Sequence, residues 1–142
     1  MAAVSCAASL SFVATPAEAA GTIQITKVYV NSPGSDLPPT NAKVNAEYTV
    51  LKNTGRKART LTGWTLRDDS RHVYTFGTFK LGAGKTVTIR NGKGTNTSRT
   101  RYWGSGYYIW NNRGGDSATL RTQAGTLVDK CRWKTVRSYT SC

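Results

Sequence analysis

Hydrophobic and polar residues alternate with a period of two along most of this chain, and no window of 11 residues carries a helical stripe. Segments that alternate or are rich in β-forming residues recur at 22–30, 43–53, 61–66, 72–76, 85–90, 117–122 and 126–133. In the second segment the alternation predicts a strand with one shared face, formed by Val44, Ala46, Tyr48 and Val50. In the fourth segment it places on one side His72, Tyr74 and Phe76.

Turn-forming stretches separate these segments. Residues 31–41, "NSPGSDLPPTN", are rich in proline, residues 54–60 form a basic turn, and residues 91–98, "NGKGTNTS", form a flexible loop. About seven to nine short strands at this spacing predict an all-β fold, an antiparallel β-sandwich. No internal repeat or linker follows residue 21, so residues 21–142 are expected to form one domain.

The first 20 residues differ in composition from the rest. They contain no Lys or Arg, a short apolar run at 7–14, and the small-x-small pattern of Ala17 to Ala19. This pattern predicts a secretory signal peptide over residues 1–20, and hence a secreted protein that diffuses away or stays with the cell wall. A signal peptide normally begins with a few basic residues, and their absence is explained if the natural start lies upstream of Met1. A disordered alanine-rich start is the alternative. No segment is long enough for a transmembrane helix.

Three cysteines occur, and Cys6 would leave with the signal peptide. In an exported chain, Cys131 and Cys142 are expected to form a disulfide that pins the C-terminal tail to the last strand. Their spacing without a nearby histidine is poor for a metal site, and we expect no metal and no cofactor.

Positive charge dominates the composition. The formal net charge is +13, and because Glu18 is the one charged residue before residue 21, the rest carries 20 basic residues against six acidic ones. An excess of this size predicts attraction to polyanions such as DNA or anionic wall polymers, without choosing among them. The alternative is a surface that is charged only for solubility.

Two blocks are more specific than composition: "LTGWTLRDDSRHVYTFG" at 61–77 and "YWGSGYYIWNNRGGDSATL" at 102–120. Their order and spacing resemble the lamin tail domain in its secreted bacterial form, and the resemblance runs from about Ile23 to Cys131. It implies an immunoglobulin-like β-sandwich that serves as an interaction module and has no known catalytic residues. One departure is Val50, which stands where the family commonly has a second acidic residue.

The aromatic residues of these blocks have two possible roles. A large buried ring removes much apolar area from water, so a sandwich of this size needs several as core anchors. We assign that role to Trp64, Tyr74, Phe76, Trp103 and Trp110. The adjacent Tyr107 and Tyr108 would point to opposite faces of a strand, so one of them should be exposed and free to stack on a base or sugar.

Basic residues cluster in the turns. The candidates for polyanion binding are Lys52, Arg56, Lys57, Arg59, Arg101, Arg113, Lys134 and Arg137. They form either one patch at an end of the sandwich or several separate solvated turns, and the sequence does not decide between the two.

An enzyme is not expected. His72 is the sole histidine and lies among aromatic residues, so a structural or surface role is expected for it. Asp68 and Asp69 are adjacent in a turn, whereas a catalytic carboxylate pair must flank its substrate. These two residues are expected to pair with their neighbours Arg67 and Arg71 instead. We therefore expect a monomeric, exported, non-catalytic module that binds an anionic polymer. The alternative is a structural domain at the cell surface that docks a protein partner.

Overall fold

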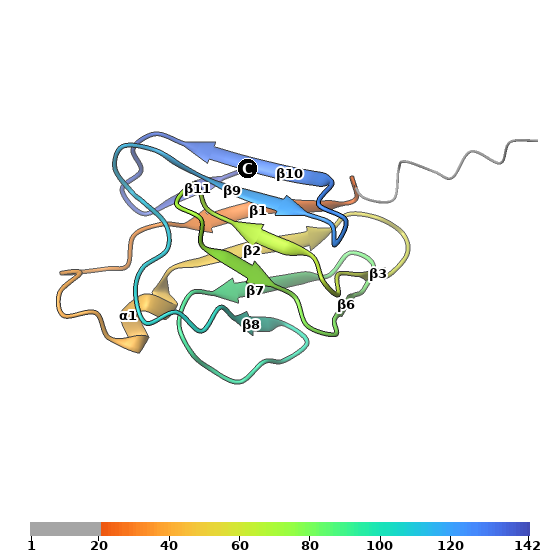
Figure 1. Ribbon diagram of the computed structural model, residues 1–142, viewed down its shortest axis with the longest axis horizontal. Coiled ribbons are helices and arrows are strands. Elements are labelled where there is room, and N and C mark those ends of the chain that lie inside the picture. Colours follow the sequence, from red (N-terminus) through yellow and green to blue (C-terminus); the bar gives the residue numbers. More distant parts are fainter. Residues whose placement is uncertain (1–20) are drawn as a thin grey trace, which may run out of the picture.

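The computed structural model describes residues 21–142 as two sheets packed face to face (Figure 1). The larger sheet has five strands in the order β11-β1-β2-β7-β8, and the smaller has four in the order β10-β9-β4-β5. A two-stranded ribbon, β3-β6, lies at one end of the sandwich (Figure 1). The predicted signal peptide, residues 1–20, and Cys6 lie outside the described residues.

The elements are short, as the spacing of turns predicts. Their bounds are β1 Ile23–Tyr29, α1 Asn41–Ala46, β2 Tyr48–Asn53, β3 Arg59–Thr60, β4 Thr65–Arg67, β5 Val73–Thr75, β6 Lys80–Leu81, β7 Thr86–Arg90, β8 Thr100–Tyr102, β9 Asp116–Arg121, β10 Leu127–Trp133 and β11 Tyr139–Ser141. The all-β, immunoglobulin-like sandwich is therefore confirmed. The described chain has more strands than seven to nine, because several are two- or three-residue pieces. One pair, β7 and β8, is parallel.

The strand predicted over 43–53 is wrong in its first half and in its orientation. Residues 41–46 form helix α1, whose first turn is capped by the hydroxyl of Thr40, which accepts from the N–H of Lys43 at 3.3 Å. The strand begins at Tyr48, and its inward side chains are Thr49, Leu51 and Asn53 rather than Tyr48 and Val50. Polar residues at two of the three inward positions hid the true alternation.

The strand predicted at 61–66 is also shorter than expected. Only its last two residues belong to β4, and Leu61 to Trp64 form a turn closed by a hydrogen bond from the N–H of Trp64 to the carbonyl of Leu61 at 2.9 Å. Gly63 has a φ of +77° in this turn, where a Cβ would also lie 2.8 Å from the side chain of Gln123. Glycine is therefore required at this position.

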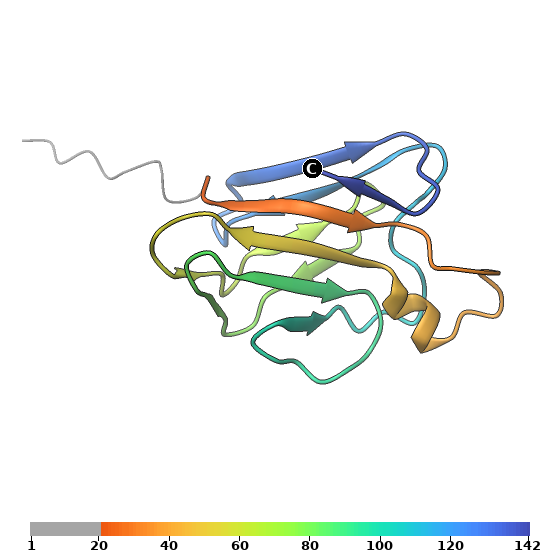
Figure 2. The same cartoon turned by 180° about the vertical axis from the view of Figure 1, so that it is seen from behind.

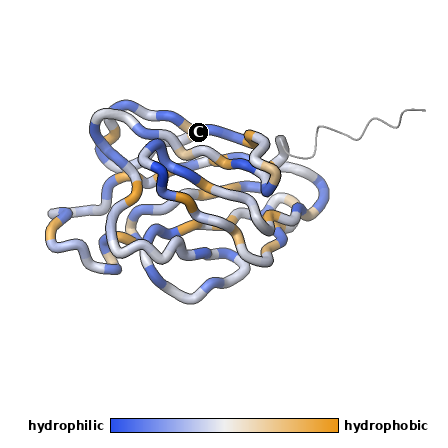
Figure 3. Tube along the Cα trace, viewed as in Figure 1, coloured by the Kyte–Doolittle hydropathy of each residue, from blue (hydrophilic) through white to orange (hydrophobic). Residues whose placement is uncertain are grey.

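The core lies between the two sheets and contains side chains from both. Hydrophobic positions are interspersed with hydrophilic ones along the chain, as Figure 3 shows. The larger sheet contributes Ile23, Ile25, Val28, Leu51, Val87 and Ile89, and the smaller sheet contributes Leu66, Tyr74, Ala118, Leu120 and Cys131. Burying each large aliphatic side chain stabilises the fold by about 1.5–3 kcal/mol.

Six aromatic rings form a continuous chain beside this aliphatic core. In order of contact they are Phe79, Phe76, Tyr74, Trp103, Trp110 and Trp133, and successive ring centroids lie 4.9–5.9 Å apart. Trp103 is half-buried and the others are buried, as is Trp64. The indole N–H of Trp133 donates to the carbonyl of Asn111 at 2.6 Å. Through Tyr74 of β5 and Trp133 of β10, the chain of rings holds the long 103–115 segment against the smaller sheet.

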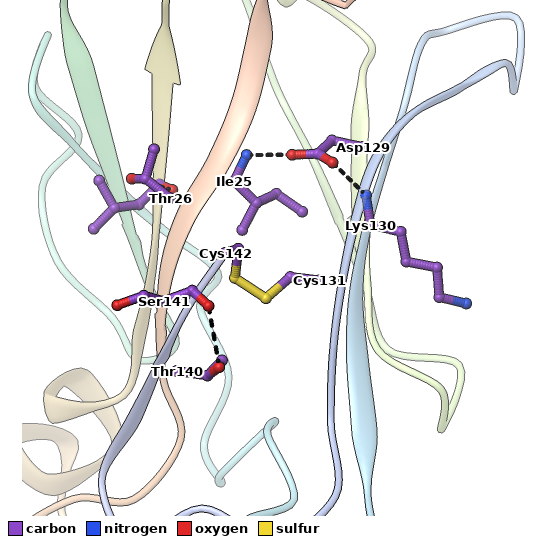
Figure 4. The surroundings of a disulfide bond; sticks show 9 residues. Ile25, Thr26, Asp129, Lys130, Cys131, Thr140, Ser141 and Cys142 are labelled. Atoms are coloured by element: carbon purple, nitrogen blue, oxygen red, sulfur yellow. Dashed lines mark hydrogen bonds between the residues drawn. A yellow bond between two sulfur atoms is a disulfide. The ribbon is translucent and has the colours of Figure 1, made fainter.

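A disulfide ties the two sheets together along one side. Cys131 lies in β10 of the smaller sheet, whereas Cys142 directly follows β11 of the larger sheet (Figure 4). The tail is therefore not merely pinned to the last predicted strand, because residues 139–141 form a strand of their own that pairs with β1. Beside the disulfide, a carboxylate oxygen of Asp129 accepts from the N–H of Ile25 at 2.7 Å, beyond the end of the β1–β11 pairing.

Removing this cross-link should destabilise the fold without changing its architecture. The bridge closes a loop with a sequence separation of 11 residues, for which chain entropy predicts a loss of about 2–3 kcal/mol in the free energy of unfolding. Urea unfolding of the protein with and without a reducing agent measures this loss. The double variant Cys131→Ser/Cys142→Ser is the control, since its unfolding should not respond to the reductant. An unchanged midpoint for the reduced wild-type protein would contradict the prediction.

Candidate functional site

Several acidic side chains of this domain accept hydrogen bonds from its own backbone rather than from its basic side chains. Among residues 21–142, the one contact within 4.0 Å between a carboxylate and a Lys, Arg or His nitrogen joins Asp68 to His72. Asp116 accepts from the N–H groups of Asn111, Asp69 and Ser117 at 2.8–3.0 Å. In the described chain, no Lys or Arg is therefore paired with a carboxylate at ion-pair distance, and the excess of basic residues sets the sign of the field.

The expected pairing of Asp68 and Asp69 with their arginine neighbours is wrong. Asp68 accepts from the backbone N–H groups of Ser70 and His72 at 3.0 and 2.7 Å, and Asp69 accepts from the hydroxyl of Ser117 at 2.6 Å. These bonds shape the turn between β4 and β5. In the described part of the chain, no group of three or more His, Cys, Asp and Glu residues could hold a metal ion.

Asn53 draws the first basic turn and the β6–β7 turn together. Its buried side-chain amide donates to the carbonyls of Lys57 and Leu81 at 2.9 and 3.0 Å. Its backbone N–H donates to the carbonyl of Lys85 at 2.9 Å, and Gly84 donates back to it. The predicted basic set of Lys52, Arg56, Lys57 and Arg59 therefore lies at the same end of the sandwich as the residues that flank the β6–β7 turn.

A cationic hollow of about 660 Å³ opens at this end, between the β6–β7 turn and the start of β8. Its lining combines three cations with four hydroxyl groups, from Lys80, Lys85, Arg99, Thr86, Thr88, Ser98 and Thr100. No acidic residue lines it. Lysine and arginine charges beside hydroxyl donors are the groups that proteins use to hold phosphate oxygens.

Arg101 is less available to a ligand than its sequence position suggests. Its guanidinium donates to the carbonyl of Thr78 at 3.0 Å and lies 4.4 Å from the ring centroid of Phe79. It therefore helps to join β8 to the loop before β6, and its side chain does not line the hollow.

The remaining predicted cations lie at the opposite end of the sandwich. Because β11 is antiparallel to β1, the segment before β11 lies at the end where β1 finishes, away from the first basic turn (Figure 1). Lys134 and Arg137 belong to this segment, which the N–H of Val136 ties to the carbonyl of Asn112, next to Arg113, at 3.0 Å. Of the two alternatives left by the sequence, a single shared patch is therefore wrong.

Tyr107 and Tyr108 lie in the 103–115 loop, outside any strand. Tyr107 is 55% exposed, and its ring packs edge to face on that of Tyr108 with centroids 5.4 Å apart. The hydroxyl of Tyr108 donates to the carbonyl of Asp36 at 3.0 Å. This pair belongs to the opposite end, away from the cationic hollow.

A buried carboxyl group anchors the same loop. Glu47 is 3% exposed and accepts hydrogen bonds from the side-chain amide of Asn91 and the N–H groups of Ile109 and Trp110. Burial, against the effect of these donors, raises the pKa of Glu47 to about 8. The buried Oδ1 of Asn91 has no hydrogen-bond partner. If the side-chain amide of Asn91 rotates by 180°, this oxygen faces Glu47 and can accept from the O–H of the protonated carboxyl group.

The comparisons with known proteins agree with this fold. The model of the Lamin Tail Domain family matches residues 16–135, which is most of the chain. The chain belongs to the lamin tail domain family. No curated protein matched the sequence. The family is one of immunoglobulin-like binding or interaction domains and is not known as catalytic. In the described part of this lamin tail domain, no helix is long and apolar enough to cross a membrane.

Lys80 and Lys85 are missing from the sequence-based set, and so is the core residue Trp133. The two lysines flank a Gly-rich turn and do not belong to a dense run of basic residues, so the local sequence around them carries no signal of a cationic cluster. Only the pairing of β7 with β8, and of β3 with β6, brings them beside Arg99 and Arg59. Trp133 lies two residues after Cys131 in β10, and both side chains are buried, so the period-two pattern of this strand could have predicted that Trp133 belongs to the core.

The raised pKa of Glu47 predicts a pH-dependent stability. The unfolded carboxyl releases its proton near pH 4.5 and the folded one near pH 8, so this contribution to the free energy of unfolding is fully present below pH 4.5 and is lost as the pH rises to 8. The slope reaches about 1.4 kcal/mol per pH unit. Glu47→Gln, which never ionises, should flatten this fall in urea unfolding measured from pH 5 to pH 8. Equal slopes for the variant and the wild type would show the assignment to be wrong.

Proposed function

We propose that this lamin tail domain is exported and binds anionic polymers, without catalysis, through the cationic hollow and the basic turns beside it. The observation that carries the proposal is the meeting of three cations and four hydroxyl groups in one concave surface with no acidic residue. The signal-peptide pattern of residues 1–20 supports an extracellular place of action.

The chemistry of the hollow favours phosphate-bearing polymers over other anions. Each lysine acts as a point charge, while the guanidinium of Arg99 can bind two oxygens of one phosphate group. Threonine and serine hydroxyls donate to the remaining oxygens. These contacts are made to a polymer backbone, so they position the ligand without selecting a sequence.

Protein docking at a sheet edge is a second candidate. The edge strand β5 carries Val73, which is 42% exposed, and an exposed edge strand can accept a strand from another protein. Binding of this type would persist in high salt, whereas binding through phosphates would not. Salt dependence therefore separates the two candidates.

Neutralising the hollow should weaken polyanion binding more than neutralising the opposite end. The test variant is Lys80→Gln/Lys85→Gln/Arg99→Gln, and the matched control is Arg113→Gln/Lys134→Gln/Arg137→Gln, which removes the same number of charges. Affinity for duplex DNA and for poly(glycerol phosphate) is measured over a range of salt concentrations. For the test variant on DNA, the slope of log affinity against log salt should become shallower by roughly 0.9 for each phosphate that the protein no longer neutralises.

The matched control distinguishes a site from a general field. If net charge alone drives binding, both triple variants lose affinity equally and the hollow is not the site. If the wild-type protein binds neither polymer at low salt, the proposed function itself is wrong.

A further inference from the structure

A row of aromatic and cationic side chains crosses the outer face of the larger sheet. In the strand registers, Tyr29 lies opposite both Tyr139 and Tyr48, Tyr48 lies opposite Arg90, and Arg90 lies opposite Tyr102. These side chains point away from the core, because their neighbours Val28, Thr49 and Ile89 are the buried ones. Figure 2 shows this sheet from its outer side, with no element drawn in front of it.

The tyrosine rings in this row stand upright on the sheet. The ring of Tyr29 is stacked on that of Tyr48, with centroids 5.3 Å apart and planes at 16°, and on that of Tyr139, at 6.0 Å and 19°. These spacings are close to the roughly 4.8 Å between neighbouring strands, so the rings stand side by side and present their rims to solvent. Tyr139 is 48% exposed, and Tyr29 and Tyr48 are half-buried.

Cations flank the stacked rings, and no carboxylate opposes them. The amine of Lys27 lies 4.0 Å from the ring centroid of Tyr139, and the guanidinium of Arg90 lies 5.4 Å from that of Tyr48. None of the six acidic residues in the described chain belongs to a strand of this sheet. The face therefore combines positive charge with aromatic rims.

This face is continuous with the cationic hollow. Thr86 and Thr88, which line the hollow, lie in β7 opposite Lys52 and Val50 of β2, on the side of the sheet that carries the tyrosine row. The tyrosine row crosses the same face near the other end of these strands, where β1 and β7 finish, so a flexible polymer held in the hollow by its phosphates can extend along β7 to reach it.

We propose that the partner is a single-stranded nucleic acid whose phosphates lie in the hollow and whose bases lie over the tyrosine rims. The rim of an aromatic ring carries positive partial charge and the face of a base carries negative charge, so the two attract in an edge-to-face contact. A duplex hides the faces of its bases, and wall polymers have none. The inference rests on the proposed function, since the phosphate contacts are those of the hollow.

The test compares two single-stranded ligands of equal charge, which differ only in whether they carry bases, and adds a duplex in which the base faces are hidden. Fluorescence anisotropy measures binding of the purified protein to an oligothymidylate of about 16 nucleotides, to an abasic phosphodiester oligomer of the same length, and to a duplex. Oligothymidylate should bind about tenfold more tightly than the abasic oligomer. Equal affinities for these two would overturn the inference and leave the proposed function standing, as would tighter binding of the duplex. Failure of every ligand to bind would instead contradict the proposed function.

A tyrosine variant locates the preference. Tyr29→Thr/Tyr139→Thr keeps β-forming residues in the row and should remove the advantage of oligothymidylate while leaving abasic affinity within about twofold. Tyr107→Thr, which removes an exposed tyrosine of the 103–115 loop that does not belong to the row, is the control and should leave the advantage unchanged. A preference that survives the double variant or disappears with the control would show that the tyrosine row does not contact bases.

Discussion

The use of acidic side chains as acceptors for backbone N–H groups is the constraint on which the rest of this structure depends. Glu47, Asp116 and Asp129 each satisfy amide donors where a strand or loop would otherwise leave them unpaired. These carboxyl groups accept from backbone N–H groups, and none of them lies within 4.0 Å of a lysine or arginine cation in the described chain. The positive field itself follows from the excess of 20 basic over six acidic residues after residue 20, and in the described chain no lysine or arginine is held in an ion pair with a carboxylate.

Aromatic packing supplies the second part of the frame. The six-ring chain from Phe79 to Trp133 runs from the loop before β6 to β10, and it holds a long loop that has little regular structure of its own. The disulfide between Cys131 and Cys142 and the bond from Ile25 to Asp129 join the same two sheets at another side. With the sheets fixed in this way, the turns at the two ends are held apart and act as separate surfaces.

The sequence predicts the fold well because its signals are local and redundant: period-two alternation, Gly-rich turns and the family blocks all indicate the same sandwich. It fails at residues 41–53, where the capped helix and the inward Thr49 and Asn53 disguise the pattern, and at β8 and β11, which are too short and polar to show one. The hollow could not be predicted because Lys80, Lys85 and Arg99 meet only through pairings between segments distant in the chain.

Lysine footprinting during polyanion binding tests the central claim most directly, namely that unpaired cations at one end of a rigid sandwich perform its function. The protein is treated with a limiting amount of an amine-reactive acetylating reagent, with and without saturating oligothymidylate. The modified lysines are then quantified by mass spectrometry. The account predicts protection of Lys80 and Lys85 by the ligand, with Lys134 labelled equally in both samples. Protection of Lys134 to the same extent, or no protection at the hollow despite binding, would contradict it.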